Sequence, residues 1–300
     1  MHVTLRQLQV FEAVARHLSF TRAAEELYLS QPAVSMQVKK MESAVGLSLF
    51  EHVGKRVHLT EAGREMQHYA RGIHALLAEA DQVVDDLKGL RRGRLSVTVA
   101  STVNYFATRV MAVFAKRHPG VRINLGVTNR EELLRQLDAN QTDIVLMGRP
   151  PENRELVAEA FLDNPLVVVA SADHRLVGTR VSLARLAQET FMFREPGSGT
   201  RMAMERFFAD HAMQPIGGMV MNSNEAIKQS VEAGLGLGVV SAHTVELELE
   251  AKRLCVLDVE HFPIRRQWYV VHRADKRLSR VAATFKDFVR AEAVALSTNN

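Results

Sequence analysis

The chain has 300 residues, enough for two or three domains of about 100–200 residues each. Its hydrophobic fraction of 47% and charged fraction of 24% are ordinary for globular proteins and exclude wholesale disorder. The single cysteine excludes an intrachain disulfide and a cysteine-based zinc site, and it suits a reducing compartment. The net charge of +4 is a weak basic excess, which permits nucleic-acid binding without arguing for it.

The sequence offers no recognisable secretory or membrane-spanning segment. Its first turns carry Arg6, Glu12 and Arg16, charges that a signal peptide would not tolerate. Apolar runs such as residues 166–170 and 235–240 are far shorter than the roughly 20 residues that a membrane helix needs. We therefore expect a cytoplasmic protein without a membrane partner.

The N-terminal segment is predicted to be mostly helical. Apolar residues recur at helical spacing over residues 5–15. Two further helices, over residues 20–27 and 31–45, are each preceded by a serine that can accept a hydrogen bond from the first helical turn. Because only residues 28–30 separate them, the sequence predicts a helix-turn-helix.

The second helix of this pair carries a polar face. Val34, Val38 and Met41 share one side, and the opposite side carries small, amide and basic residues. Such a face suits the major groove of DNA, where amides and hydroxyls can meet base edges and lysines can meet phosphates. An ordinary helical hairpin with a solvated face is the common alternative, and the helix pattern alone favours neither.

The predicted hairpin over residues 49–60 favours DNA binding. Its tip carries Lys55 and Arg56, which can contact the DNA backbone or the minor groove as a wing, although a solvated turn is the alternative for both. The candidate DNA-contacting residues are Thr21, Arg22, Gln31, Pro32, Ala33, Ser35, Met36, Lys39, Lys55 and Arg56.

Residues 61–90 contain the most regular apolar pattern in the chain. From Ala62 to Leu90 the apolar positions alternate in steps of four and three, a repeat of about 3.5 residues. So narrow a seam indicates a linker helix that forms a two-stranded coiled coil in a dimer, and the alternative is a core helix of one domain. The predicted dimerisation residues are Met66, Tyr69, Ile73, Leu76, Val83 and Leu87. Residues 91–94 are predicted to form a hinge.

Residues 95–300 alternate short strands with helices. This alternation predicts α/β architecture, with parallel sheets that are covered by helices on both faces. Because the segment is too long for one small α/β unit, we expect two lobes. The first lobe is placed over about 95–163 and 269–300, and the second over about 164–268.

Four loops lie between a predicted strand and a predicted helix, where open α/β sheets bind ligands. Three of them, residues 101–102, 128–129 and 147–149, carry hydroxyl, amide or arginine side chains. The fourth, residues 194–201, adds glycines that let a ligand approach the backbone, although a capped glycine-rich turn is its alternative. Together the loops favour a small anionic ligand. The predicted effector-binding residues are Ser101, Thr102, Thr128, Asn129, Met147, Arg149, Glu195, Ser198, Gly199, Thr200, Arg201 and Asn224.

Residues 4–63 resemble the winged helix-turn-helix of LysR-type transcriptional regulators, in the stretch LRQLQVFEAVARHLSFTRAAEELYLSQPAVSMQVKKMESAVGLSLFEHVGKRVHLTEAG. The resemblance extends in architecture through the linker to the two-lobed part, and so covers nearly the whole chain. It implies a DNA-binding domain over residues 1–60, a dimerisation helix over 61–90 and an effector-binding domain over 95–300. The last would have two lobes joined by crossing strands, as in periplasmic binding proteins.

The resemblance also implies a mode of action. Regulators of this family bind double-stranded DNA through the second helix and the wing, at interrupted dyad sites upstream of promoters. They dimerise through the linker helix and usually assemble as a dimer of dimers, so a homodimer or a homotetramer is expected. An activator of this type acts on RNA polymerase. Met36 departs from the family pattern, because that position is often basic.

Five stretches of the C-terminal part, ASTVNYF, TNREELLRQL, DIVLMGRPP, FREPGSGTR and NSNEAIKQSVEAGLGLGVVS, look particularly like the CbbR branch of the family. Members of this branch control carbon-dioxide-fixation (Calvin cycle) operons and respond to phosphorylated or nucleotide metabolites. The resemblance therefore implies a small, phosphorylated effector. A LysR-type regulator of another pathway, with a carboxylate effector, is the alternative.

Other classes of protein are less favoured. An enzyme with an accessory helical domain lacks support, because the sequence has no nucleophile elbow, dinucleotide-binding glycine motif or zinc-protease motif. Histidines such as His68 and His74 are six apart rather than four, so no metal or cofactor is expected. A small-molecule binding module for transport would explain two lobes but not residues 1–90.

Overall fold

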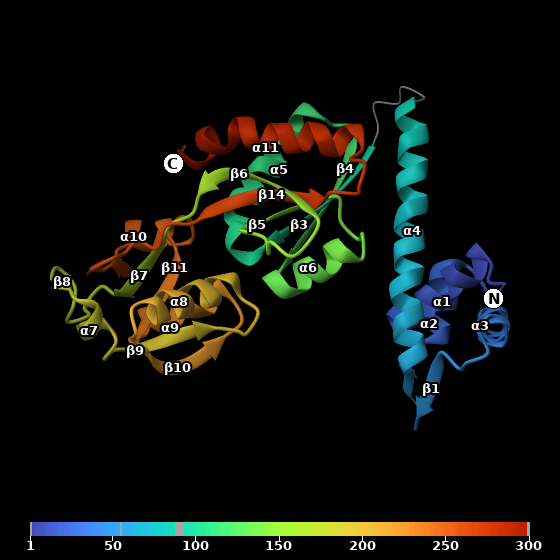
Figure 1. The fold of residues 1–300 in the computed structure, drawn as a ribbon, viewed down its shortest axis with the longest axis horizontal. Coiled ribbons are helices and arrows are strands. Elements are labelled where there is room, and N and C mark those ends of the chain that lie inside the picture. Colours follow the sequence, from blue (N-terminus) through green and yellow to red (C-terminus); the bar gives the residue numbers. More distant parts are fainter. Residues whose placement is uncertain (1, 55, 88–92, 299–300) are drawn as a thin grey trace. The chain divides into compact units, whose positions relative to one another are not determined.

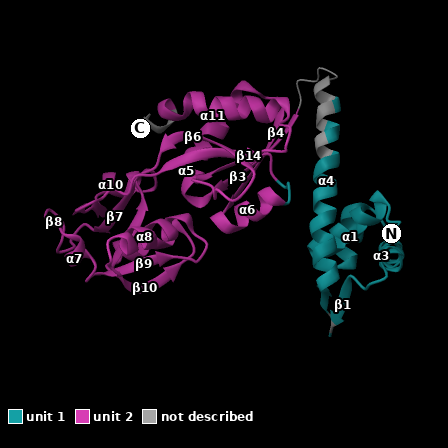
Figure 2. Ribbon diagram, viewed as in Figure 1, with its two compact units in different colours: residues 1–84, 139–141 teal, residues 85–138, 142–300 magenta. Residues whose placement is uncertain are grey.

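The computed structural model describes residues 2–54, 56–87 and 93–298. The chain divides into two compact units, residues 1–84 with 139–141 and residues 85–138 with 142–300 (Figure 2). Each unit has a hydrophobic core of its own, as expected for separate domains.

The first unit is a winged helix-turn-helix that continues into a long helix. Its elements are α1 (Leu5–His17), α2 (Phe20–Leu27), α3 (Gln31–Val45), β1 (Phe50–Val53), β2 (Arg56–Leu59) and α4 (Glu61–Leu87) (Figure 1). The predicted helices over residues 20–27 and 31–45 are confirmed at those bounds. The two predicted caps are confirmed as well, since Ser19 Oγ accepts from the Arg22 amide at 3.3 Å and Ser30 Oγ from the Ala33 amide at 3.4 Å.

The hairpin β1–β2 is anchored to the helices that precede it. The ring of Phe50 lies 5.4 Å from the ring of Phe11 and 5.6 Å from that of Phe20. Glu42 of α3 accepts hydrogen bonds at Oε1 from the amides of Leu49 and Phe50, at 2.8 and 3.3 Å. These contacts fix the wing relative to α3.

Helix α4 begins against the same hairpin. Thr60 Oγ1 donates to the carbonyl oxygen of Ser48 at 2.7 Å and accepts from the Gly63 amide at 3.0 Å, so Thr60 is the predicted cap. A Cβ atom on Gly63 would stand 2.0 Å from the carbonyl oxygen of Leu49. The close approach of α4 to the strand therefore requires glycine at this position.

The apolar residues of α4 lie on two sides of the helix rather than on one seam. Ala62, Met66, Ala70 and Ile73 pack against the core of the first unit. The large apolar residues that are exposed on α4 are Tyr69, Leu76, Leu77 and Val84, with exposed fractions of 61, 61, 40 and 47%. Of the predicted dimerisation residues, Met66 and Ile73 thus contact their own domain, and the side chains of Val83 and Leu87 lie outside the described residues.

The second unit has two lobes, each built on a five-stranded sheet. The elements of lobe I are β3 (Gly93–Ala100), η1 (Ser101–Val103), α5 (Asn104–Arg117), β4 (Val121–Thr128), α6 (Arg130–Asp138), β5 (Ile144–Gly148), β6 (Leu156–Asp163), β14 (Gln267–Arg273) and α11 (Arg280–Thr298). The elements of lobe II are β7 (Leu166–Ser171), β8 (Arg180–Val181), α7 (Leu183–Leu186), β9 (Thr190–Arg194), α8 (Gly199–Asp210), β10 (Ile216–Met221), α9 (Asn224–Glu232), β11 (Leu237–Ser241), η2 (Ala242–Thr244), α10 (Glu246–Glu250), β12 (Leu254–Val256) and β13 (Asp258–Val259).

Each sheet is covered by helices on both faces. In lobe I the strand order is β4-β3-β5-β14-β6, with α5 and α11 packed on one face and α6 on the other (Figure 1). In lobe II the order is β10-β9-β11-β7-β12, with α8 packed on one face and α9 on the other. The sequence alternation predicted this layered arrangement.

The sheets are mixed, which corrects the prediction of parallel sheets. Strand β3 pairs in parallel with β4 and β5, but β14 runs antiparallel to both β5 and β6. In lobe II, β7 runs antiparallel to β11 and β12. The exceptions follow from chain crossing, because β14 returns from the other lobe and therefore enters its sheet in the reverse direction.

Two segments cross between the lobes side by side. The amide of Leu166 donates to the carbonyl oxygen of Ile264, and the reverse bond also forms, both at 3.0 Å. The amide of Asn164 donates to the carbonyl oxygen of Arg266 at 2.7 Å. Of the hinge predicted over residues 91–94, Gly93 and Arg94 already belong to β3, and residues 91 and 92 lie outside the described residues.

Candidate functional sites

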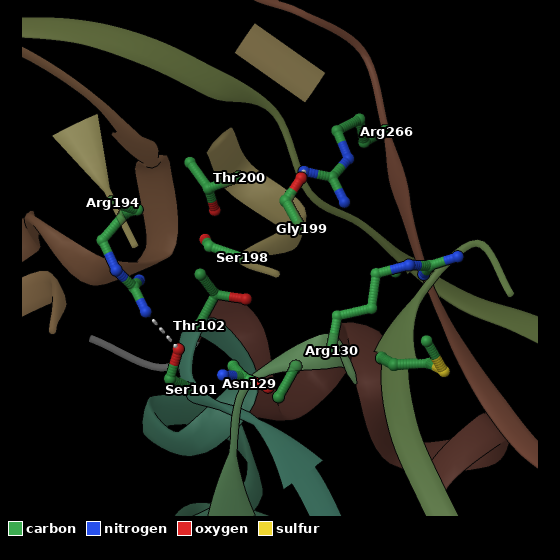
Figure 3. A pocket seen from close by; sticks show the side chains of 12 residues that line it. Ser101, Thr102, Asn129, Arg130, Arg194, Ser198, Gly199, Thr200 and Arg266 are labelled. Carbon is green, nitrogen blue, oxygen red and sulfur yellow. Dashed lines mark hydrogen bonds between the residues drawn. The ribbon is translucent and has the colours of Figure 1, made fainter. Parts of the chain in front are cut away.

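A pocket of about 380 Å³, open solvent at its mouth included, lies between the two lobes (Figure 3). Lobe I contributes the ends of β3 and β5 and the residues that follow β3 and β4, and lobe II contributes the end of β9 and the start of α8. The residues that line it are Ala100, Ser101, Thr102, Asn129, Arg130, Met147, Gly148, Arg194, Ser198, Gly199, Thr200 and Arg266.

Helix starts converge on this pocket because parallel strands end there. Ser101 and Thr102 begin the turn that leads into α5. Asn129 caps α6, since its Oδ1 accepts from the Glu132 amide at 3.0 Å. Ser198 caps α8, since its Oγ accepts from the Arg201 amide at 3.5 Å. Amides at helix N-termini that bear hydroxyl neighbours favour an anion in the space between them.

Arg194 forms one wall of the pocket and joins the two lobes. Its side chain is 3% exposed, and its guanidinium donates to both carboxylate oxygens of Glu195, at 2.7 and 2.9 Å. Its Nη2 also donates to Ser101 Oγ of lobe I at 3.1 Å, and Nη1 donates to Asn224 (Figure 3). Because Glu195 neutralises it, Arg194 mainly orders the pocket.

Arg130 and Arg266 stand on the opposite side of the pocket (Figure 3). Among the described residues neither has an ion pair with a carboxylate; Arg130 Nη1 donates to the carbonyl oxygen of Arg149 at 2.7 Å, and Arg266 Nη1 to that of Gly199 at 3.1 Å. Burial and the nearby charge of Arg130 lower the pKa of Arg266 to about 10. Burial, and then the charge of Arg154, lower the pKa of Arg130. Both groups stay charged at neutral pH, so the pocket has an excess of positive charge.

The glycines of the pocket leave room for Arg266. A Cβ atom on Gly148 would stand 2.5 Å from Nη2 of Arg266, and one on Gly199 would stand 3.6 Å from the same atom. The guanidinium therefore lies directly against the backbone where β5 ends.

The structure brings together seven of the predicted effector-binding residues, namely Ser101, Thr102, Asn129, Met147, Ser198, Gly199 and Thr200. The other five do not line the pocket. Glu195 and Asn224 hold Arg194, while Arg201 donates to Glu205 and to the carbonyl oxygen of Arg194. Arg149 pairs with Glu152 at 2.6 Å, and Thr128 ends β4.

The three arginines of the pocket are absent from the predicted set. Arg194 belongs to the loop 194–201 that the sequence singled out, and Arg130 directly follows the loop 128–129, so both positions were a usable signal. Arg266 lies in a crossing segment, remote in sequence from the other lining residues, and no local pattern marks it.

The predicted DNA-contacting residues of α2 and α3 are mostly exposed. Thr21, Arg22, Gln31, Pro32 and Lys39 are exposed, as is Met36 at 50%, while Ala33 and Ser35 are half-buried. On the wing Arg56 is exposed, and Lys55 lies outside the described residues.

The cations on this face are available to a ligand. Among the described residues of the first unit, no ion pair holds Arg22, Lys39 or Arg56, whereas Arg16 is bound to Glu26 at 2.6 Å. Hydrogen bonds from Arg16 and His17 lower the pKa of Glu26 to about 2, so that carboxylate stays ionised and keeps Arg16 occupied. The exposed residues of α3 therefore form a polar surface with uncompensated positive charge, which suits the DNA backbone.

In the part of the chain that the structure describes, no group of three or more histidine, cysteine, aspartate or glutamate residues could hold a metal ion. None of its helices is long and apolar enough to cross a membrane.

Two family models match the chain. "Bacterial regulatory helix-turn-helix protein, lysR family" matches residues 5–64, and "LysR substrate binding domain" matches residues 88–294. The first of these covers the helix-turn-helix and the wing, and the second covers both lobes.

Similar proteins extend this result over the full length. A "RuBisCO operon transcriptional regulator" from Allochromatium vinosum is 62% identical over 297 residues, which is 99% of this chain and 98% of the relative. The "HTH-type transcriptional regulator CbbR" of Rhodospirillum rubrum is 48% identical over 96% of both chains. Among solved structures, the Synechocystis PCC6803 CcmR regulatory domain in complex with 2-PG is 39% identical, with a TM-score of 0.65, and covers 69% of this chain and 99% of its own.

Proposed function

Because the chain belongs to the LysR family of transcriptional regulators, which bind DNA and small-molecule effectors, we propose that it activates carbon-dioxide-fixation genes in response to a phosphorylated metabolite. The names of the relatives from Allochromatium vinosum and Rhodospirillum rubrum support the choice of genes. The regulator would act in the cytoplasm, where it would recruit RNA polymerase to the promoter.

The observation that carries this proposal is the excess positive charge of the pocket between the lobes. Arg130 and Arg266 face a space ringed by the hydroxyls of Ser101, Thr102 and Thr200, and no carboxylate of the described residues neutralises either guanidinium. A phosphate group supplies about two negative charges and three acceptor oxygens, which match these donors. The 2-PG complex of CcmR, a relative that is 39% identical, supports a phosphorylated effector.

A thermal-shift screen tests the class of effector. We would heat the full-length protein with Calvin-cycle intermediates, 2-PG and nicotinamide nucleotides, and with carboxylates of similar size that lack phosphate. A ligand present at 100 times its Kd adds about 2.7 kcal/mol to the free energy of unfolding, so an effector must raise Tm. If only the carboxylates raise Tm, the effector is a carboxylate and another pathway becomes the better assignment; if nothing does, the pocket assignment fails.

The exposed face of α3 and the wing supports DNA binding through the second helix. Gln31 and Ser35 would meet base edges, while Arg22, Lys39 and Arg56 would meet phosphates. Lys55, at the tip of the wing, would add a further backbone contact. Gel-shift and footprinting experiments on the DNA upstream of carbon-fixation genes test this assignment, and binding that lacks both sequence preference and salt sensitivity would contradict it.

Exposed apolar surfaces support a homodimer or a homotetramer. On α4, Tyr69, Leu76 and their exposed apolar neighbours would form the dimer seam. In lobe II, the edge strand β10 exposes Ile216, Met219 and Val220, at 51, 55 and 56%. An unpaired edge with a row of apolar side chains is a surface that a second copy can cover.

A further inference from the structure

A second cavity, which we call the hinge groove, runs along the segments that cross between the lobes. It has about 1850 Å³ of open space, solvent at its mouth included, against about 380 Å³ for the effector pocket. One side is formed by α8 and the other by residues 263–267. The two cavities share only Arg130, Gly199 and Arg266, so Thr102 lines the effector pocket alone and Arg265 lines the hinge groove alone.

The rim of the hinge groove is rich in arginine. Arg130, Arg149, Arg206, Arg265 and Arg266 line it, together with two aspartates, Asp163 and Asp210. Two of the arginines are compensated, because Arg149 pairs with Glu152 at 2.6 Å and Arg206 lies 3.9 Å from Asp210.

Positive charge remains after these pairs are removed. Among the described residues Arg130, Arg265 and Arg266 have no ion pair. Asp163 Oδ1 instead accepts a hydrogen bond from the side-chain amide of Gln267 at 3.1 Å. Three guanidiniums therefore face one aspartate. The effector pocket can use Arg130 and Arg266, but it cannot use Arg265.

The wall of the groove beside these charges is apolar. Met202, Phe207, Ile264 and Tyr269 line it, and Met202 is 51% exposed. The ring of Phe207 is held from behind by Phe262, at a centroid distance of 4.7 Å. An exposed methionine and a fixed aromatic ring next to free guanidiniums suit a ligand that has a flat apolar body and an anionic group.

We propose that the hinge groove is a second ligand site, which binds a small organic anion with an aromatic or flat apolar body, and which can be filled while the effector pocket is occupied. The anionic group lies against Arg265, which the effector pocket cannot use, and the apolar body lies on Met202 and Phe207. This site does not depend on the proposed identity of the effector, since its own arginine is Arg265.

Calorimetric titration of the full-length protein with 1-naphthyl phosphate tests the site, with inorganic phosphate and 1-naphthol as partial probes. The whole probe should bind more tightly than either part, because each part satisfies only one wall. Arg265→Ala should weaken binding at least about fivefold, since it removes a charged hydrogen-bond donor. Arg253→Ala, an exposed arginine of lobe II paired with Glu232, is the matched control and should not change the affinity.

Variants of residues that line only one of the two cavities distinguish binding at the two sites. Thr102→Ala should weaken the binding of 2-PG but not that of 1-naphthyl phosphate. Saturation with 2-PG should leave the site for 1-naphthyl phosphate available. Equal binding by the Arg265→Ala and Arg253→Ala variants, or full competition by 2-PG, would overturn the second site. If 2-PG does not bind but Arg265→Ala still weakens the binding of 1-naphthyl phosphate, the result counts against the proposed effector class and supports the hinge groove. Because Arg265 is exposed, an unchanged Tm without ligand checks that the variant is folded.

Discussion

At the scale of single residues, the effector pocket depends on where Arg266 is held. Its guanidinium lies against the backbone of Gly148 and donates to the carbonyl oxygen of Gly199 at 3.1 Å. No carboxylate among the described residues shares its charge, so its position decides how strongly an anion is bound.

Gly148→Ala should therefore weaken effector binding with little loss of stability. The new methyl group would stand 2.5 Å from Nη2 of Arg266, and the end of this flexible side chain would swing away. We expect about a tenfold loss of affinity for the phosphorylated effector and a change of less than about 1 kcal/mol in the free energy of unfolding. Titration calorimetry and thermal melts measure both quantities. An unchanged affinity would show that Arg266 does not contact the effector.

Ser35→Ala and Arg56→Ala should each weaken DNA binding without changing the oligomeric state. Loss of a hydrogen bond by the first variant should cost about 0.5–1.5 kcal/mol of binding free energy. Loss of a phosphate contact by the second should lower the slope of log affinity against log salt by about one. Gel shifts at several salt concentrations, with light scattering on the same samples, test both variants. A change in oligomeric state would contradict the assigned roles.

Residue patterns predicted the hydroxyl side of the effector pocket but not its arginine side. Ser101, Asn129 and Ser198 are local features, since each follows a strand or caps a helix, and such positions are visible in a sequence. Arg266 comes to the pocket only because the chain crosses between lobes twice, which no local pattern encodes. Glu195, which we predicted to meet the ligand, instead pairs with its sequence neighbour Arg194.

At the scale of elements, α4 has two apolar sides, and only one of them is covered by its own domain. Its side that carries Met66 and Ile73 packs on its own domain, while its side that carries Tyr69 and Leu76 is exposed. From the sequence repeat we predicted that both sets form one seam, because a 3.5-residue repeat does not say which face of the helix meets which partner.

Helix bounds were easier to predict than strand direction. Caps such as Ser30 are local features, whereas the reversed direction of β14 follows from the path of the whole chain.

Charge on the exposed side of α4 should dissociate the proposed dimer. In the double variant Tyr69→Glu with Leu76→Glu, two carboxylates on each helix would face those of a second copy across the seam. We expect a monomer by light scattering at micromolar concentration and a loss of cooperative binding to a two-half-site DNA, while Tm changes little. An oligomer that persists would place the dimer seam elsewhere.

Gly63→Ala should destabilise the first unit by about 1–3 kcal/mol, because the added methyl group would meet the carbonyl oxygen of Leu49 and force the backbone apart. Gly72→Ala is the matched control in the same helix. Its methyl group would meet nothing within 4 Å, and alanine should stabilise the helix by up to about 1 kcal/mol. Chemical denaturation of the two variants measures the difference, and equal stabilities would contradict the packing of α4 on the wing.

At the scale of the whole molecule, the lobes are linked by contacts that close around the pocket. Arg194 of lobe II reaches Ser101 of lobe I at 3.1 Å, and Lys228 Nζ donates to the hydroxyl oxygen of Tyr105 at 3.1 Å. An anion bound between Arg130 of lobe I and the start of α8 in lobe II would add a bridge between the lobes and so favour one lobe arrangement over another. In an oligomer this shift would change how the DNA-binding domains are spaced, and hence how far the DNA is bent.

The most direct test is the bend angle of the promoter DNA in complex with the full-length protein, measured by energy transfer between the DNA ends. The effector would be the phosphorylated metabolite that raises Tm most in the screen. We expect this metabolite to change the bend angle with the wild-type protein and to leave it unchanged with the Arg266→Gln variant, which still binds the DNA. A wild-type complex that binds the metabolite without any change in bend angle, or an Arg266→Gln complex that responds fully, would contradict this expectation.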